Sequence, residues 1–320
     1  MFFSEDDVLE FIEENDVKFI RLTFCDTFGN MKNIAIMPRE LHRAIVDGIP
    51  FNATDLLESS HQNLLLKPDI STLSVLPWRP QSGRVVRFFC TLYRMDGTPY
   101  EGDLRRNLRE TMKSIQEHGY QCEMGTRCEF YLFETDMQGK PTRTPCDQGG
   151  YLDVAPLDKC ENTRREICLS LDEMGLNPTT SCHKHGPGQN EIDFACSNAL
   201  TAADNMVHYK TVVKTIASQN GFYASFMPKP FPDCSGSALK ITISVKKDDA
   251  SIFGTQPQEH AAGGPCVHRR HSQSGAGVHH VFQPHHQLLR ALWTAGCPQP
   301  HQLVRGEPHS PDSAAVCAGT

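Results

Sequence analysis

The alternation of apolar and polar residues divides the chain into amphipathic helices and half-buried strands. Near the N-terminus, Ser4 precedes three acidic residues and a regularly spaced apolar face, which predicts a helix capped by that serine. Period-2 alternation over residues 17–24 and 31–37, around the turn residues 26–30, predicts a hairpin. Strands are also predicted over 72–76 and 84–92. The first part of the chain is therefore expected to be a small β-rich module.

From Asp103, a second candidate N-cap, helical and strand patterns are mixed. The predicted helices cover 104–118, 161–173 and 203–218, and the predicted strands cover 128–134, 190–194, 222–227 and 239–245. No internal repeat is present in the sequence. The predicted fold class is α+β, with the small N-terminal module followed by a larger mixed domain.

The composition changes near residue 260. Residues 1–260 carry 27 Lys and Arg against 36 Asp and Glu, whereas residues 261–320 carry 4 against 2. The last segment has eight His, no Lys and no sustained apolar periodicity. Residues 261–320 are therefore predicted to be non-globular.

The overall composition excludes several classes of protein. A chain of 320 residues with 39% hydrophobic residues has room for two globular domains. No apolar run approaches the ~20 residues of a membrane-spanning helix, and the acidic N-terminus is unlike a signal peptide. A cytoplasmic protein is expected, with its 13 cysteines as reduced thiols. The net charge of −7 argues against nucleic acid as a partner.

Three segments place acidic or polar residues beside glycines at strand ends, where a ligand can approach the backbone. They are GTRCEFYLF, SCHKHGPGQNEIDF and GSALKITIS. Taken singly, each has a plain structural interpretation. Glu129 and Glu191 fit the exposed side of an amphipathic strand, and Gly186-Pro187-Gly188 fits a turn.

In this order and at these separations, the three segments resemble the motifs of the class I glutamine synthetase family, G-x-E-x-E-F, H-H-E-x-x-P-G-Q-x-E and G-S-G-[LM]-H. The resemblance covers residues 1–260, and further matches are VKFIRLTFCDTFGNMK, STLSVLPWRP, GGYLDVAPLD, RREI, LTAADN and FMPKP. It implies a β-grasp domain over residues 1–100 and a partial catalytic domain, an antiparallel sheet with flanking helices, over 101–260.

The resemblance also implies an activity and an assembly. The family uses ATP and Mg²⁺ or Mn²⁺ to form γ-glutamyl phosphate, from which ammonia displaces the phosphate. Its members form dodecamers with active sites between neighbouring subunits. This chemistry needs carboxylates, because hard divalent cations prefer oxygen ligands.

This sequence departs from the family at the metal ligands. Arg127 and Lys184 stand at positions where the family has Glu, and Lys240 stands where it has a metal-binding His, whereas Glu129 and Glu191 are retained. In the N-terminal loop that reaches a neighbouring active site in the family, Asn52 replaces an Asp.

The three replacements together add five positive charges, close to the four that two divalent ions would bring. We therefore predict that Arg127, Lys184 and Lys240 take the place of the metals and pair with Glu129 and Glu191. Random decay is the alternative explanation, although decay would scatter replacements among residue types.

The glutamate-binding loop of the family is represented by Ser235-Gly236-Ser237-Ala238. Ser235 and Gly236 are the candidate substrate-binding residues, since the Gly236 backbone is open to a carboxylate. A simple turn before the next strand is the competing interpretation.

The tail resembles nothing in the family as written. Read one base out of frame, it permits family-like segments such as N-P-T-T-N-S-Y, so a frame change near residues 260–267 is the preferred explanation. The alternatives are a disordered interaction arm or a metal-binding segment. The metal-binding candidates are Cys266, His268, His271, His279 and His280.

Two functions remain open at this stage. The first is an ATP-dependent glutamate–ammonia ligase, or a γ-glutamyl-amide ligase acting on another amine. The second is a non-catalytic regulatory or interaction protein, forming homo-oligomers or associating with active homologues. The replaced metal ligands favour a catalytically impaired protein, because function depends on the site rather than the fold.

Overall fold

The computed structural model describes residues 4–57, 63–79, 82–248, 250–251 and 314–318. The chain divides into two compact units, residues 1–107 and 108–320. No helix of the described residues is both long and apolar enough to cross a membrane.

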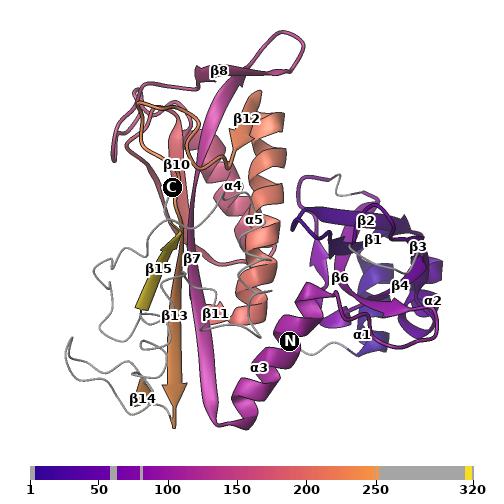
Figure 1. Cartoon of the computed structure of the whole chain (residues 1–320). Helices are drawn as coiled ribbons and strands as arrows, with labels where there is room; N and C mark the ends of the chain where they lie inside the picture. The colour runs from indigo at the N-terminus through magenta and orange to yellow at the C-terminus, as the bar shows by residue number, and fades with distance from the viewer. Residues whose placement is uncertain (1–3, 58–62, 80–81, 249, 252–313, 319–320) are drawn as a thin grey trace. The chain divides into compact units, whose positions relative to one another are not determined.

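The N-terminal unit is built on one mixed sheet with the strand order β2-β1-β6-β4-β3, and β5 pairs with β6 (Figure 1). Among the described strands of this unit, only β1 and β6 are parallel to each other. The elements are α1 (Glu5–Glu14), β1 (Val17–Cys25), β2 (Met31–Ile36), η1 (Pro38–Glu40), α2 (Leu41–Val46), β3 (Ile49–Asn52), β4 (Asn63–Pro68), η2 (Ile70–Thr72), β5 (Ser74–Val75) and β6 (Arg84–Arg94).

The central strand β6 is buried almost continuously from Val85 to Leu92, as expected of a strand covered on both faces. Ser4 caps α1 as predicted: its hydroxyl accepts a hydrogen bond from the Asp7 N–H, and the Asp7 carboxylate accepts one from the Ser4 N–H. The hairpin predicted over residues 17–37 is β1 and β2. The mixed sheet and its helices agree with the β-grasp fold expected for this unit.

The second unit is organised around one long strand, β7 (Tyr120–Thr135). The main sheet order is β14-β13-β7-β10-β9, and β8, β11 and β12 also pair with β7. All these pairs are antiparallel. The remaining strands are β8 (Pro141–Pro145), β9 (Pro178–His183), β10 (Gln189–Phe194), β11 (Ser197–Asn198), β12 (Phe222–Ser225), β13 (Leu239–Lys247), β14 (Ala250–Ser251) and β15 (Ala314–Ala318).

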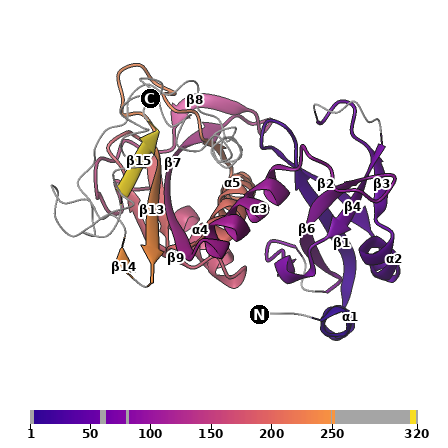
Figure 2. The same cartoon turned by 60° about the horizontal axis from the view of Figure 1, so that its bottom comes forward.

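Helices α4 (Glu161–Glu173) and α5 (Ala199–Gln219) lie side by side against one face of this sheet (Figures 1 and 2), and α3 (Leu104–Glu117) leads into β7. Tyr209 of α5 is fully buried, and its hydroxyl donates to the carbonyl oxygen of Cys128 on β7. Its ring meets those of Phe130 and Phe194 edge-on. Since side chains alternate along a strand, Glu129 belongs to the opposite face of β7.

Several elements differ from the sequence predictions. Residues 72–76 contain the end of a 3₁₀ turn and the two-residue strand β5, and β7 begins at Tyr120 rather than at 128. Strands β3, β4, β8 and β9 were not predicted, because their short runs carry Pro, Asn or mixed polar residues. In the tail, Ala314–Ala318 pairs with β13 as β15, where no strand was expected.

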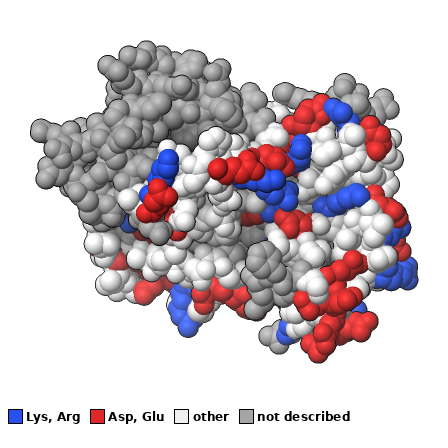
Figure 3. Space-filling model, turned by 90° about the horizontal axis from the view of Figure 1, so that it is seen from below, with Lys and Arg blue, Asp and Glu red and all other residues white. Residues whose placement is uncertain are grey.

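On the face drawn in Figure 3, acidic and basic side chains of the described residues are interspersed. Most of the tail, including Cys266, His268, His271, His279 and His280, lies outside the described residues. The proposed frame change therefore stays a prediction.

Candidate functional site

Two of the predicted site residues face each other across neighbouring strands. Glu129 on β7 and Glu191 on β10 are register partners. Two carboxylates in this arrangement repel each other unless a cation lies between them. The cation is Lys184, one residue beyond the end of β9, whose Nζ lies 3.2 Å from Oε1 of each glutamate. The three side chains are only 12–16% exposed, so this is a mostly buried cluster.

The second oxygen of Glu129 is also engaged. Its Oε2 accepts the Ala238 N–H at 2.8 Å and the Gln189 side-chain amide at 3.2 Å. The same amide donates to the Gly236 carbonyl at 2.9 Å, and the Tyr131 hydroxyl donates to the Ser235 carbonyl. The backbone groups of the loop that contains Ser235 and Gly236 are therefore hydrogen-bonded to side chains of the sheet.

The electrostatics follow from one ammonium placed between two carboxylates. Burial alone would lower the pKa of Lys184, but the charges of Glu191 and Glu129 and their hydrogen bonds raise it above its ordinary value. Burial raises the pKa of Glu191, and the ammonium offsets this only in part because Asp193 and Glu129 add further negative charge. Lys184 is thus held firmly in its charged form.

The other two replacement cations lie elsewhere on the sheet. Arg127 is the register partner of Asp193, and its Nε lies 3.2 Å from the Asp193 carboxylate. Arg127 therefore pairs with this aspartate rather than with either glutamate. Lys240, half-buried on β13, is the register partner of Arg127, and among the described residues no ion pair joins it to Glu129 or Glu191.

An aromatic ring lies beside the ammonium group of Lys184. Tyr151 stacks on His185 with the ring centroids 4.4 Å apart, and the Nζ of Lys184 lies 5.5 Å from the centroid of Tyr151. The Lys184 N–H donates to the Gln189 carbonyl at 2.7 Å, which fixes the backbone of the turn.

A buried ion pair lies directly beside this turn. His183 precedes Lys184, and its Nε2 lies 3.0 Å from Oδ1 of Asp147, with both side chains fully buried. The other ring nitrogen, Nδ1, lies 2.7 Å from the Lys184 carbonyl. Burial lowers the pKa of His183, but these hydrogen bonds and the carboxylate raise it overall. Both ring nitrogens of His183 thus face acceptor oxygens, which favours the protonated imidazole, and the contact with the Lys184 carbonyl positions Lys184.

Asn52 belongs to the N-terminal unit. It is exposed at the end of β3, and its Oδ1 accepts the Thr54 N–H at 3.0 Å. Its predicted role toward a neighbouring subunit stays a prediction.

The cluster does not fit a hard divalent cation. Such an ion needs several free oxygen ligands, whereas here an ammonium group lies between the two carboxylates and Glu129 already accepts three donors. The residues present fit a closed ion-pair cluster that needs no metal.

Asp193, Gln189 and Tyr151 also belong to this region but were not predicted from the sequence. The signal for two of them was available, because Gln189, Glu191 and Asp193 alternate on one face of the predicted strand. The stacking of Tyr151 on His185 joins residues from separate loops, which no local pattern predicts.

Two family models match the chain. The glutamine synthetase β-grasp domain matches residues 16–95, and the glutamine synthetase catalytic domain matches residues 101–268. The second match alone covers more than half of the chain.

Individual relatives agree with these models. The glutamine synthetases of Clostridium saccharobutylicum and Methanosarcina mazei are 43% and 42% identical over 78% of this chain. This chain spans 57% of the length of each.

Solved structures share the fold at low identity. The apo form of GmaS has a TM-score of 0.75 at 22% identity and covers 98% of this chain and 75% of its own. Plasmodium falciparum glutamine synthetase has a TM-score of 0.71 at 21% identity, over 80% of this chain and 56% of its own. With both domains matched in sequence and in fold, the chain belongs to the glutamine synthetase family.

Proposed function

We propose that this chain is a catalytically impaired member of the family, in which the Lys184 ammonium replaces a bound divalent cation. The observation that carries the proposal is the position of Lys184 Nζ, 3.2 Å from both Glu129 and Glu191. By resemblance, these two glutamates stand at metal-ligand positions and Lys184 stands at a third. ATP and Mg²⁺ or Mn²⁺, which the family uses, are then not held here as they are in an active enzyme.

The second candidate is the family reaction itself, ATP-dependent ligation of ammonia to glutamate. The observation that favours it is the 43% identity to a glutamine synthetase over 78% of the chain. The two candidates differ in one measurable property, since the ligase requires Mg²⁺ or Mn²⁺ and the impaired protein does not bind them at this cluster.

The test is calorimetric titration of Mn²⁺ into the wild-type chain and three variants. The first variant, Lys184→Glu, restores one family ligand. The second is the triple variant Arg127→Glu, Lys184→Glu, Lys240→His, which restores three. Lys246→Glu is the matched control, because it makes the same charge change on β13, where Lys246 pairs only weakly with Glu123 at 3.8 Å.

We expect Mn²⁺ binding in the restored variants and none in the wild type or the control. Tight Mn²⁺ binding by the wild type, abolished by Glu129→Ala, would overturn the proposal and favour the ligase. An assay of glutamine formation from glutamate, ammonia and ATP on the same samples then separates the two functions.

Assembly is a separate part of the proposal. Family membership supports an oligomer of this chain, or its association with active homologues as a regulatory subunit. Native mass spectrometry of the chain alone, and after mixing with an active glutamine synthetase, tests both possibilities.

A further inference from the structure

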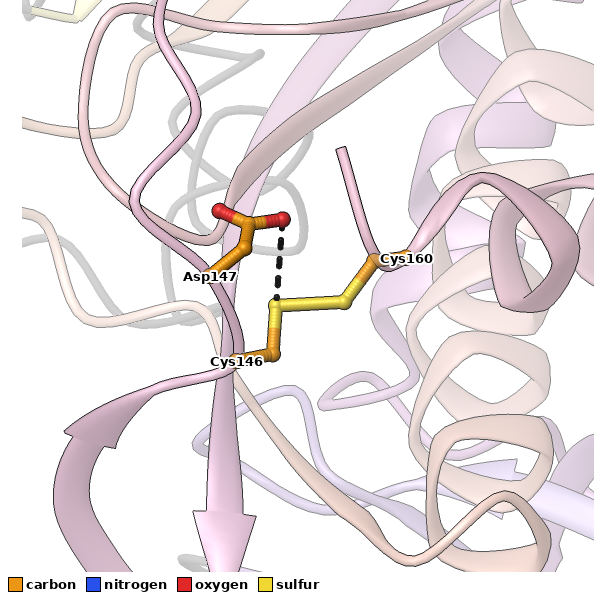
Figure 4. Close-up of side chains that lie close together, drawn as sticks. All are labelled: Cys146, Asp147 and Cys160. Atoms are coloured by element: carbon orange, nitrogen blue, oxygen red, sulfur yellow. Dashed lines mark hydrogen bonds between the residues drawn. A yellow bond between two sulfur atoms is a disulfide. The ribbon is translucent and has the colours of Figure 1, made fainter. Parts of the chain in front are cut away.

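Cys146 and Cys160 form a buried pair at the two ends of one loop. Cys146 directly follows β8 and Cys160 directly precedes α4, and the two sulfur atoms are bonded to each other in the structure (Figure 4). Both residues are buried, with 3% and 0% exposure. This pairing differs from the expectation of reduced thiols throughout the chain. The bond closes the loop of residues 147–159.

Asp147 lies beside the two sulfurs, and its carboxylate oxygens are already engaged in hydrogen bonds. Its Oδ1 accepts from the N–H groups of Gly149 and Gly188, at 3.2 and 2.7 Å, and from His183 at 3.0 Å. Its Oδ2 accepts the Lys159 N–H at 3.2 Å, and the Cys146 sulfur lies 3.7 Å from the same oxygen. A carboxylate offers about four lone-pair sites. Little capacity remains for a metal ion bound jointly by Cys146, Asp147 and Cys160.

The charges around the pair are balanced without a cation. Asp147 is opposed by His183, and Asp158 is opposed by Arg164 at 2.7 Å. A divalent ion would offset the charge of two thiolates, so the number of free ligands decides between a metal and a disulfide. With Asp147 engaged, the two sulfurs are fewer than the four ligands of a structural zinc site. The surroundings therefore favour oxidation to a disulfide over metal binding.

We propose that Cys146 and Cys160 are a redox-modification site whose disulfide locks the loop of residues 147–159. This inference is independent of the proposed function. The oxidant is a small-molecule disulfide such as oxidised glutathione. One protein thiolate attacks it, forms a mixed disulfide and releases one small thiol. The second protein thiolate then attacks the mixed disulfide and releases the other small thiol, so the two protons lost by the protein end on the two small thiols.

The disulfide constrains residues that surround Lys184. The loop carries Tyr151, which stacks on His185, and begins with Asp147, which holds His183. Because both sulfurs are buried, exchange with a small disulfide requires the loop to open first. Oxidation then prevents the loop from reopening, since the cross-link removes the open conformations.

The first test counts thiols in the full chain. The protein is reduced, treated with oxidised glutathione, denatured and alkylated, and its mass is measured. Thirteen cysteines are present, and we expect two to be protected from alkylation, with peptide mapping joining Cys146 to Cys160. Cys146→Ser should lose this protection. Cys122→Ser is the matched control on β7 and should keep it.

The second test avoids substitutions. Lys159 is exposed and directly precedes Cys160, so trypsin reports opening of the loop. We expect cleavage after Lys159 to be about tenfold slower, or slower still, in oxidised than in reduced wild type. Thirteen alkylated cysteines after oxidation would overturn the proposal. So would one equivalent of Zn²⁺ released on denaturation together with zinc-dependent protection of both thiols, or equal cleavage rates in the two redox states.

Discussion

Glu129 and Glu191 are paired across β7 and β10, and both accept a hydrogen bond from the same ammonium group. Removing one partner of a buried charge cluster costs more than the cluster contributes, because the remaining charges lose their compensation. Here the loss of Lys184 would leave two mostly buried carboxylates facing each other. The cluster is thus a structural requirement of the sheet, whatever the chemistry of the chain.

Replacing Lys184 by Met should therefore destabilise the second unit strongly. We expect the free energy of unfolding, measured with urea, to fall by about 3 kcal/mol. Adding Glu191→Gln to this variant removes one of the two carboxylate charges and should recover part of the loss. A Lys184→Met variant as stable as wild type would show that the ion pairs contribute little.

Arg127 should behave differently, although it too replaces a family ligand. Its side chain is 39% exposed, whereas its partner Asp193 is only 9% exposed and would keep a buried charge without it. Arg127→Gln should therefore lower the free energy of unfolding by about 1–2 kcal/mol, between the values for an exposed and a buried pair. A loss equal to that of Lys184→Met would show that Arg127 belongs to the same cluster.

The His183–Asp147 pair predicts a pH dependence of stability. The pKa of His183 is raised in the folded state, so its contribution is fully present below its unfolded value of about 6.5 and is lost as the pH rises through the folded value. The pKa of Asp147 is lowered, so its contribution is lost only as the pH falls below about 3.8. Wild type should thus lose stability as the pH rises above about 6.5.

Urea unfolding of wild type and His183→Gln between pH 6 and pH 9 measures this effect. The variant should be less stable at pH 6 and should show a flatter profile. His185→Gln is the matched control, since His185 is exposed, and it should keep the wild-type slope. Parallel profiles for wild type and His183→Gln would contradict the assignment.

Substitutions at two glycines distinguish the free-energy cost of a positive φ from the cost of a steric contact made by an added Cβ. Gly175 and Gly188 have φ values of +79° and +68°. A Cβ at Gly188 would lie 2.7 Å from the Leu132 carbonyl oxygen, whereas one at Gly175 would meet no described atom within 4 Å.

Gly175→Ala should cost about 1 kcal/mol of unfolding free energy through φ alone. Gly188→Ala should cost about 2 kcal/mol more, because backbone atoms must move. Thermal or urea unfolding of the two variants checks the difference, and equal losses would show that the contact is relieved without cost.

The sequence predicted two strands of the candidate site, over 128–134 and 190–194, but not their register. Arg127 lies just before the first of these predicted strands, so its place on β7 two residues from Glu129 was not predicted. Which residues oppose each other depends on the pairing of two strands that are more than 50 residues apart in the sequence. A shift of two residues in this register would have placed Arg127 opposite Glu191 instead of Asp193. The pairing of Lys184 with both glutamates could likewise be predicted from their opposite charges. The positions of the three side chains could not, because they depend on this register.

Predictions from the sequence were correct where all the residues of a motif are neighbours in the chain. The cap formed by Ser4 requires only residues 4–7, and it was predicted correctly. Strand β9 carries consecutive Thr and Ser residues without clear alternation, and its assignment depends on pairing with β10. Its last residue, His183, was therefore not recognised as a buried partner of Asp147.

The long strand β7 has a consequence for how the second unit opens. It is hydrogen-bonded along its length to β8, β10, β11, β12 and β13. No neighbouring strand can detach without exposing part of it, so its central amides should exchange with solvent only in global unfolding. Glu129 lies on this strand, so one of the two carboxylates that Lys184 joins is expected in the slowest-exchanging segment of the unit.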